Sequence, residues 1–141
     1  MNAPLYTTEI LRLAASLEEP RVLGREDGRA ELRSPTCGSR ISLTVELDDQ
    51  GRVIGISQRV HACAFGQASA ALLEQGAAGR TGAEVETALA QLAEWLGGSE
   101  TEPTWANVMA LAPARSRKSR HGAILLPFRA LAAAMDAARR G

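Results

Sequence analysis

The chain has 141 residues, of which 45% are hydrophobic and 4% aromatic, and its 16 lysines and arginines balance its 16 acidic residues. This length suits a single domain over residues 1–141 that buries a core of its own. The zero formal net charge predicts neither a nucleic acid nor a membrane surface as partner, and no apolar run approaches the roughly 18 residues of a membrane span. We therefore expect a globular, cytoplasmic protein.

Residues 5–17 show a helical period and predict an amphipathic helix, which Pro20 stops. Its apolar positions are Leu5, Ile10, Leu11, Ala14 and Leu17. Farther on, apolar and polar residues alternate, and "DDQG" at 48–51 supplies a turn. Residues 40–62 therefore predict a β-hairpin, with 30–32 as a candidate third strand.

Three helical segments are expected after the hairpin. Small residues at helical spacing in 66–75 predict a helix that ends at Gly76 or Gly79. The sequence "TGAE" at 81–84 is a capping box, and it predicts a second helix that ends at Gly97. A short helix is expected within residues 99–118, followed by the basic loop "ARSRKSR".

The last segment predicts a helix that lies against the sheet. Its apolar face is formed by Ile124, Leu125, Phe128, Leu131 and Met135. Pro127 falls inside this pattern, and an interior proline loses one backbone hydrogen bond. We therefore expect the helix either to bend at Pro127 or to begin near it.

Charge is uneven along the chain. Residues 60–112 carry six glutamates against Arg80, whereas residues 113–141 carry six arginines and Lys118 against Asp136. Such an arrangement either steers an acidic partner or forms a solvated helix face.

Two cysteines and a histidine stand at the junctions between predicted elements. Cys37 lies in "SPTCGSR", where a proline and a glycine mark a tight turn. Cys63 ends a strand and opens a helix, a position that favours a thiolate, and His121 begins the last helix. Two interpretations stand: the three residues are metal ligands, or the cysteines are small hydrophobic side chains and His121 caps a helix.

The motifs of common enzymes are missing from the sequence. No nucleophile is paired with a base in a recognisable spacing, and no glycine-rich loop suits a phosphate. Hydrolytic and nucleotide-dependent chemistry is therefore not expected.

Residues 34–85 resemble the IscU and NifU N-terminal family of iron–sulfur cluster assembly scaffolds. The likeness rests on the Pro-x-Cys-Gly turn at 35–38, the hairpin, the Ala-Cys junction at 62–63, the Ser/Ala-rich helix and the Gly-Arg-Thr at 79–81 that leads into another helix. The stretch "PARSRKSRHGAILL" looks more like the SufU branch, which carries extra sequence between its second and third ligands.

The resemblance implies an α+β fold in which a small antiparallel sheet of about three strands is packed by helices on one face. It implies a scaffold or carrier, not an enzyme, that binds iron or an Fe–S cluster, with [2Fe–2S] as the first choice. The implied ligands are Cys37, Cys63 and His121. Gly122 stands where the family has its third cysteine, and Ser39 stands where it has an aspartate, so Ser39 is a further candidate ligand.

Counting ligands leaves one position open. A [2Fe–2S] cluster needs four outer ligands, and the fourth can come from a second protein, from a small thiol or from a symmetric dimer. Zinc, held by the same three residues and a water, is the alternative to iron.

The resemblance also implies partners and alternative functions. The expected partners are a cysteine desulfurase, other Fe–S assembly proteins and apo-protein recipients, and the chain itself is expected to be a monomer or a weak homodimer. The alternatives are a zinc-dependent sulfur-transfer partner of the desulfurase and a non-catalytic paralogue that docks on the assembly machinery through its basic C-terminal region.

Overall fold

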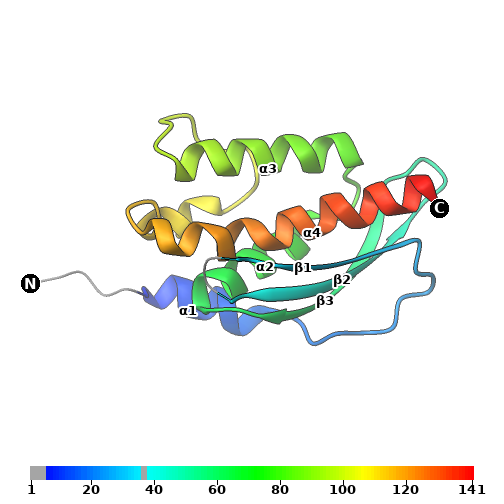
Figure 1. The fold of residues 1–141 in the computed structure, drawn as a ribbon, viewed down its shortest axis with the longest axis horizontal. Helices are drawn as coiled ribbons and strands as arrows, with labels where there is room; N and C mark the ends of the chain where they lie inside the picture. Colours follow the sequence, from blue (N-terminus) through cyan, green and yellow to red (C-terminus); the bar gives the residue numbers. More distant parts are fainter. Residues whose placement is uncertain (1–5, 36–37) are drawn as a thin grey trace, which may run out of the picture.

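The computed structural model describes residues 6–35 and 38–141. In chain order its elements are α1 (Thr8–Ser16), β1 (Gly28–Arg33), β2 (Arg40–Leu47), β3 (Val53–His61), α2 (Ala64–Gly76), α3 (Gly82–Leu96), the 3₁₀ helices η1 (Val108–Ala114) and η2 (Lys118–Arg120), and α4 (His121–Arg140) (Figure 1). Within the described residues, no helix is long and apolar enough to cross a membrane.

The three strands form one antiparallel sheet in the order β1-β2-β3, which confirms the predicted hairpin and its third strand. The hairpin turn is closed by Asp48, whose side-chain Oδ1 accepts hydrogen bonds from the backbone N–H groups of Gln50 and Arg52, both at 2.9 Å. Gly51 in this turn has a φ of 77°, a conformation that glycine adopts without steric cost.

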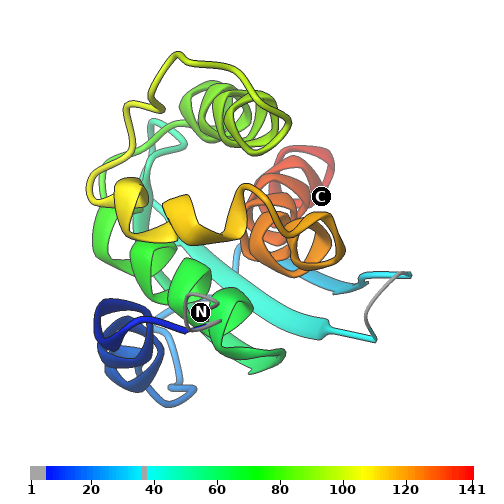
Figure 2. The same cartoon turned by 90° about the vertical axis from the view of Figure 1, so that its left-hand side faces the viewer.

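Helices cover one face of the sheet, as the resemblance implies. Helix α4 packs against β1 and β2, α2 packs against β3, and α1 and α3 lie on the outer sides of α2 and α4 (Figures 1 and 2). The segment 17–27, which joins α1 to β1, passes over the other face near the hairpin turn. Its Leu23 side chain is 7% exposed and lies beside Gly55 of β3.

Helix α4 supplies the centre of the core. Its Ile124, Phe128 and Leu131 side chains are fully buried. The helix begins at His121 and continues through Pro127, so the alternative that it begins near Pro127 is wrong. Contacts with α2 explain the early start, because the Ser69 hydroxyl donates a 2.5 Å hydrogen bond to the carbonyl of Ile124 in this first part of the helix.

The remaining helix predictions are confirmed within small shifts. Helix α1 begins after Thr7, whose hydroxyl accepts a hydrogen bond from the backbone N–H of Ile10, and α2 ends at Gly76. Helix α3 follows Thr81 with the expected capping box. The short helix expected within residues 99–118 is the 3₁₀ helix η1, and Leu5 lies outside the described residues.

Candidate functional site

The sheet topology brings two of the predicted ligand positions to one end of the sheet. The β1–β2 turn contains Cys37, and β3 runs antiparallel to β2, so β3 ends where β2 begins and leads directly into Cys63. In the register, Arg40 at the start of β2 is opposite His61 at the end of β3. The cysteine turn and the β3–α2 junction are therefore neighbours.

Cys37 itself lies outside the described residues, but the residues around it close a short turn. The backbone N–H of Ser34 donates to the carbonyl of Ser39 at 2.8 Å, and the N–H of Gly38 donates to the carbonyl of Ser34 at 3.3 Å. Gly38 has a φ of 71°, as expected for the glycine that the turn signal requires. Ser39, the further candidate ligand, is 5% exposed and sits at the foot of this turn.

Cys63 is the N-cap residue of α2 and is half-buried against the core. The described Cys63 side chain forms no capping hydrogen bond, so the N–H groups of the first turn of α2 are not used by its sulfur. Its backbone is extended, with φ −66° and ψ 173°, as the prediction of a strand-to-helix junction requires. A thiolate at this place faces the positive end of a helix dipole.

The start of α4 lies against the first turn of α2. A Cβ atom on Gly66 would lie 3.3 Å from both the Cβ and the carbonyl oxygen of Ala123, and 2.6 Å from the Cβ of Ala62. Glycine at this position therefore allows the two helices to approach closely at their N-terminal ends. The approach brings the beginning of α4, with His121 and Gly122, to the same end of the molecule as Cys63.

His121 caps a helix, but not the one that it begins. Its ring Nε2 lies 2.9 Å from the carbonyl oxygen of Ala114 and 3.2 Å from that of Arg115, at the end of η1. Because both partners are acceptors, Nε2 carries the proton and Nδ1 of the neutral ring has the free lone pair. The ring is half-buried, and within the described residues Nδ1 forms no hydrogen bond.

The predicted ligand set remains a prediction. The described residues contain no group of three or more His, Cys, Asp or Glu side chains that could hold a metal ion. Cys37 is outside those residues, so this finding does not cover the set Cys37, Cys63 and His121.

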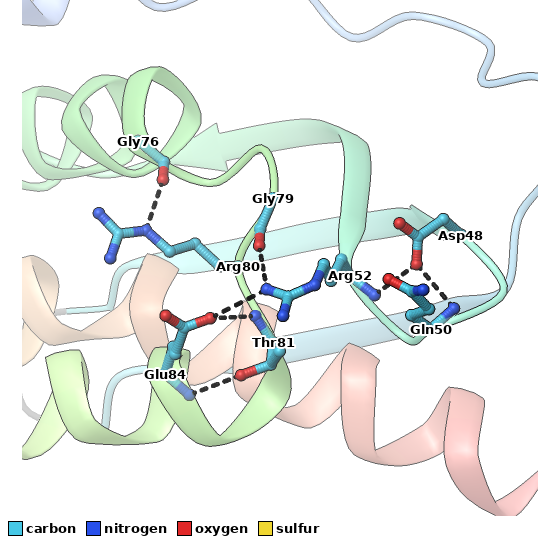
Figure 3. A network of polar contacts seen from close by, with 8 residues as sticks. All are labelled: Asp48, Gln50, Arg52, Gly76, Gly79, Arg80, Thr81 and Glu84. Atoms are coloured by element: carbon cyan, nitrogen blue, oxygen red, sulfur yellow. Dashed lines mark hydrogen bonds and ion pairs between the residues drawn. The ribbon is translucent and has the colours of Figure 1, made fainter.

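The Gly-Arg-Thr motif at 79–81 lies at the opposite end of the sheet and has a structural role. Val53 exchanges backbone hydrogen bonds with this segment: its N–H donates to Arg80 at 2.9 Å, and its carbonyl accepts from Gly79 at 2.8 Å. The Arg80 side chain donates to the carbonyl of Gly76 (Figure 3). Its guanidinium carbon also lies 4.5 Å from the centre of the Trp105 ring. The motif thus ties the end of α2 to the start of β3.

Sequence analysis did not identify a group of basic residues near the end of the sheet where β3 leads into Cys63, which we call the cysteine end. Arg33, Arg40, Arg59 and His61 are all exposed, and they occupy alternate positions on the three strands. In the sequence, polar and apolar residues alternate on each of these strands, which predicts that the polar ones, the basic residues included, share a face of their own strand. Only the strand register shows that the basic residues of the three strands lie side by side.

Comparisons with known proteins agree with this arrangement. The sequence model of the family described as "NifU-like N terminal domain" matches residues 5–116, so the match ends before α4. No curated protein matched the chain in sequence.

Two solved structures are similar over nearly the whole chain. The crystal structure of a nitrogen-fixing NifU-like protein (N-terminal) from Brucella abortus has a TM-score of 0.86 and 30% identity, and the match covers 96% of this chain and 95% of that one. The crystal structure of a candidate iron–sulfur cluster assembly scaffold protein for the SUF system from Fervidobacterium islandicum AW-1 has a TM-score of 0.80 and 18% identity, with 93% and 96% coverage. At that identity the second likeness shows the fold alone.

Proposed function

Because the chain belongs to the family of the NifU-like N-terminal domain, we propose that it is a scaffold or carrier in iron–sulfur cluster assembly. Its cargo is iron or a [2Fe–2S] cluster, bound by Cys37, Cys63 and His121 and handed to apo-protein recipients in the cytoplasm. The observation that carries the proposal is the meeting of the β1–β2 turn, the start of α2 and the start of α4 at one end of the fold.

The hydrogen bonds of His121 support its role as a ligand. A histidine that binds a metal through one ring nitrogen usually donates the N–H of the other to a backbone carbonyl or a carboxylate, which fixes the tautomer. In this chain Nε2 donates to two carbonyl groups, and Nδ1 has its lone pair available.

Gly122 determines how many ligands this chain offers to the proposed cargo. It offers no ligand at the position where the family has a cysteine, so one coordination position of the cargo is filled from outside the chain. Fewer thiolates bind a cluster less tightly, and weaker binding favours transfer to a recipient. A cysteine desulfurase is the expected source of the sulfide.

Anaerobic reconstitution with ferrous iron and sulfide tests the proposal. The wild-type protein should gain thiolate-to-iron charge-transfer absorption and bound iron, and Cys37→Ala and Cys63→Ala should each lose both. His121→Ala should retain less iron than its matched control His61→Ala, because His61 is the other histidine of the chain and is not a proposed ligand. A colourless, iron-free wild-type protein would overturn the proposal, and zinc recovered in place of iron would favour the zinc alternative.

Substitution of Gly122 tests the open position. Gly122→Cys should retain the cluster longer than the wild type during transfer to an apo-ferredoxin, because it supplies the missing thiolate. Gly122→Ala is the control, since it changes the helix by a methyl group without adding a ligand. Equal retention by the two variants would show that position 122 takes no part in the site.

A further inference from the structure

The outer face of the sheet, away from α2 and α4, is covered over one half only. Near the hairpin turn, the segment 17–27 lies on it: the N–H of Arg21 donates to the hydroxyl of Ser57, and Leu23 lies beside Gly55. The other half, toward the cysteine end, is open and forms a shallow depression of about 500 Å³. We call this open half the basic face, because its exposed basic residues are Arg33, Arg40, Arg59 and His61, with Glu31 as the acidic member.

The arginines of the basic face have no internal counter-charge. Glu31 is already paired with Arg29, at 2.9 Å. Within the described chain, the guanidinium groups of Arg33, Arg40 and Arg59 form no ion pair and no hydrogen bond. These groups are therefore available to an external anion.

The strand register makes this arrangement unfavourable for the fold itself. Arg40 lies directly opposite Arg33 on β1 and directly opposite His61 on β3. The guanidinium groups of Arg33 and Arg40 are thus like charges directly opposite each other on neighbouring strands, an arrangement that destabilises a sheet. Charges on edge strands can be explained as protection against aggregation, but Arg40 is on the central strand, where that explanation fails.

We propose that the basic face is a docking surface for an acidic segment of a protein partner. Guanidinium groups bind carboxylates through two parallel hydrogen bonds, and three of them on adjacent strands offer a fixed pattern to a row of carboxylates. The docked carboxylates would also relieve the repulsion between Arg33 and Arg40.

The dimensions and chemistry of the basic face favour a polypeptide over a nucleic acid. Three strands and two rows of residues span about 10 Å by 7 Å, which is short for a phosphate backbone. No Phe, Tyr or Trp side chain of the described residues lines the depression, so it lacks the large aromatic platforms on which single-stranded bases stack.

The basic face adjoins the candidate cluster site. His61 is two residues before Cys63, and Arg40 directly follows Ser39. A partner docked here would lie beside the cysteine end of the sheet. That it exchanges the cargo rests on the proposed function, whereas the docking itself does not.

A decaglutamate peptide, titrated into the metal-free, reduced protein, tests the docking surface. The Nε–H NMR signals of Arg33, Arg40 and Arg59 should shift, while those of Arg12 and Arg129 should not. Arg40→Glu should weaken binding about tenfold because it removes the central guanidinium, and at the same time raise Tm by about 2 °C because it places opposite charges across the strands. The matched control Arg129→Glu makes the same change in net charge on α4 and should alter binding less than about twofold.

Several results would overturn the proposal. They are equal shifts at all exposed arginines, unchanged affinity in Arg40→Glu, or tighter binding of inorganic pyrophosphate or of an oligothymidylate of equal charge at the same three arginines. Because no metal or sulfide is present, a failure of cluster reconstitution leaves this test unaffected, and a failure here leaves the cluster proposal unaffected.

Discussion

Gly28, the first residue of β1, lies directly against the backbone of α4. A Cβ atom at this position would lie 1.9 Å from the carbonyl oxygen of Ala134, and 3.1 Å from the Cβ of Ala138. The first of these atoms belongs to the backbone of a helix in the core, so it cannot move aside cheaply. The absence of a side chain at residue 28 therefore sets how closely α4 approaches the sheet.

Gly28→Ala should lower the free energy of unfolding by about 3 kcal/mol, because the added methyl group forces α4 away from β1. Gly82→Ala is the matched control: it adds the same methyl group at the first residue of α3, where no atom lies within 4 Å. That change should be neutral or slightly stabilising, since alanine favours a helix. Urea denaturation of both variants checks the prediction, and equal losses of stability would contradict it.

Glu74 is a half-buried carboxylate between α2 and the segment after α1. It accepts a hydrogen bond from the backbone N–H of Glu18 at 2.9 Å, and one of 3.4 Å from the Gln58 side chain. Burial is the largest influence on this group, and it raises the pKa of Glu74 above its ordinary value. The hydrogen bonds from Glu18 and Gln58 oppose this shift without cancelling it.

The raised pKa predicts the sign of a pH effect. Between the ordinary pKa of 4.5 and the raised value, the native state binds more protons than the unfolded state, so the stability that Glu74 contributes falls as pH rises through this window. Glu74→Gln should therefore gain stability relative to the wild type as pH rises from below 4.5 toward neutrality. Urea denaturation across that range measures the difference, with Glu94→Gln on the exposed side of α3 as control. A difference that shrinks with rising pH would contradict the assignment.

At the scale of elements, α3 is held at its start by a reciprocal pair of hydrogen bonds. The Thr81 hydroxyl accepts from the backbone N–H of Glu84 at 3.2 Å, and the Glu84 carboxylate accepts from the N–H of Thr81 at 3.0 Å. The Arg52 guanidinium lies 3.6 Å from the same carboxylate (Figure 3). The backbone hydrogen bond from Thr81 is the main reason that the pKa of Glu84 lies below its ordinary value.

Thr81→Ala should destabilise the protein by about 1 kcal/mol, because the backbone N–H of Glu84 at the start of α3 loses the hydroxyl that accepts its hydrogen bond. Thr87→Ala removes the same hydroxyl from the exposed middle of α3 and should be neutral or slightly stabilising. Thermal unfolding of the two variants distinguishes them, and a larger loss in Thr87→Ala than in Thr81→Ala would refute the role of the cap.

Elements with local signals could be predicted from the sequence, and elements fixed by tertiary contacts could not. The capping box of α3 and the Asp48 turn are complete within a few residues, so their patterns were sufficient. The start of α4 depends on contacts with Ser69 and Gly66, which lie more than fifty residues earlier in the chain. The local sequence pattern around Pro127 therefore could not predict where this helix begins.

The same distinction applies to the candidate site. The helix-start position of Cys63 followed from the change of period in the sequence, and the structure confirms it. The carbonyl partners of His121 lie in η1, an irregular segment without a pattern, so only the structure shows which ring nitrogen is available. The assignment of His121 as a ligand stays a prediction.

At the scale of the whole molecule, the candidate site joins parts of the chain that are far apart in sequence. Its predicted ligands stand in the β1–β2 turn and at the starts of α2 and α4. A metal bound there would link these parts in the native state, whereas the unfolded chain holds them apart, so binding should stabilise the fold.

Zinc, used as a redox-inert probe, should raise the Tm of the reduced wild-type protein. At a free concentration of about one hundred times Kd the stabilisation should be about 2.7 kcal/mol. Differential scanning fluorimetry checks the shift, with Cys63→Ala as the variant that should show little of it. An equal rise in Tm for both proteins would place the zinc elsewhere.

The central position of α4 has a consequence for the chain during its synthesis. This helix is the last described element, yet β1, β2, α2 and α3 all pack against it. Until the ribosome has released α4, the apolar face of β1 and β2 lacks the helix that covers it, and the start of α2 lacks the contacts at Gly66 and Ser69 that hold it. A nascent chain that lacks α4 therefore exposes hydrophobic surface to chaperones, and the end of the sheet that leads into Cys63 is not yet packed.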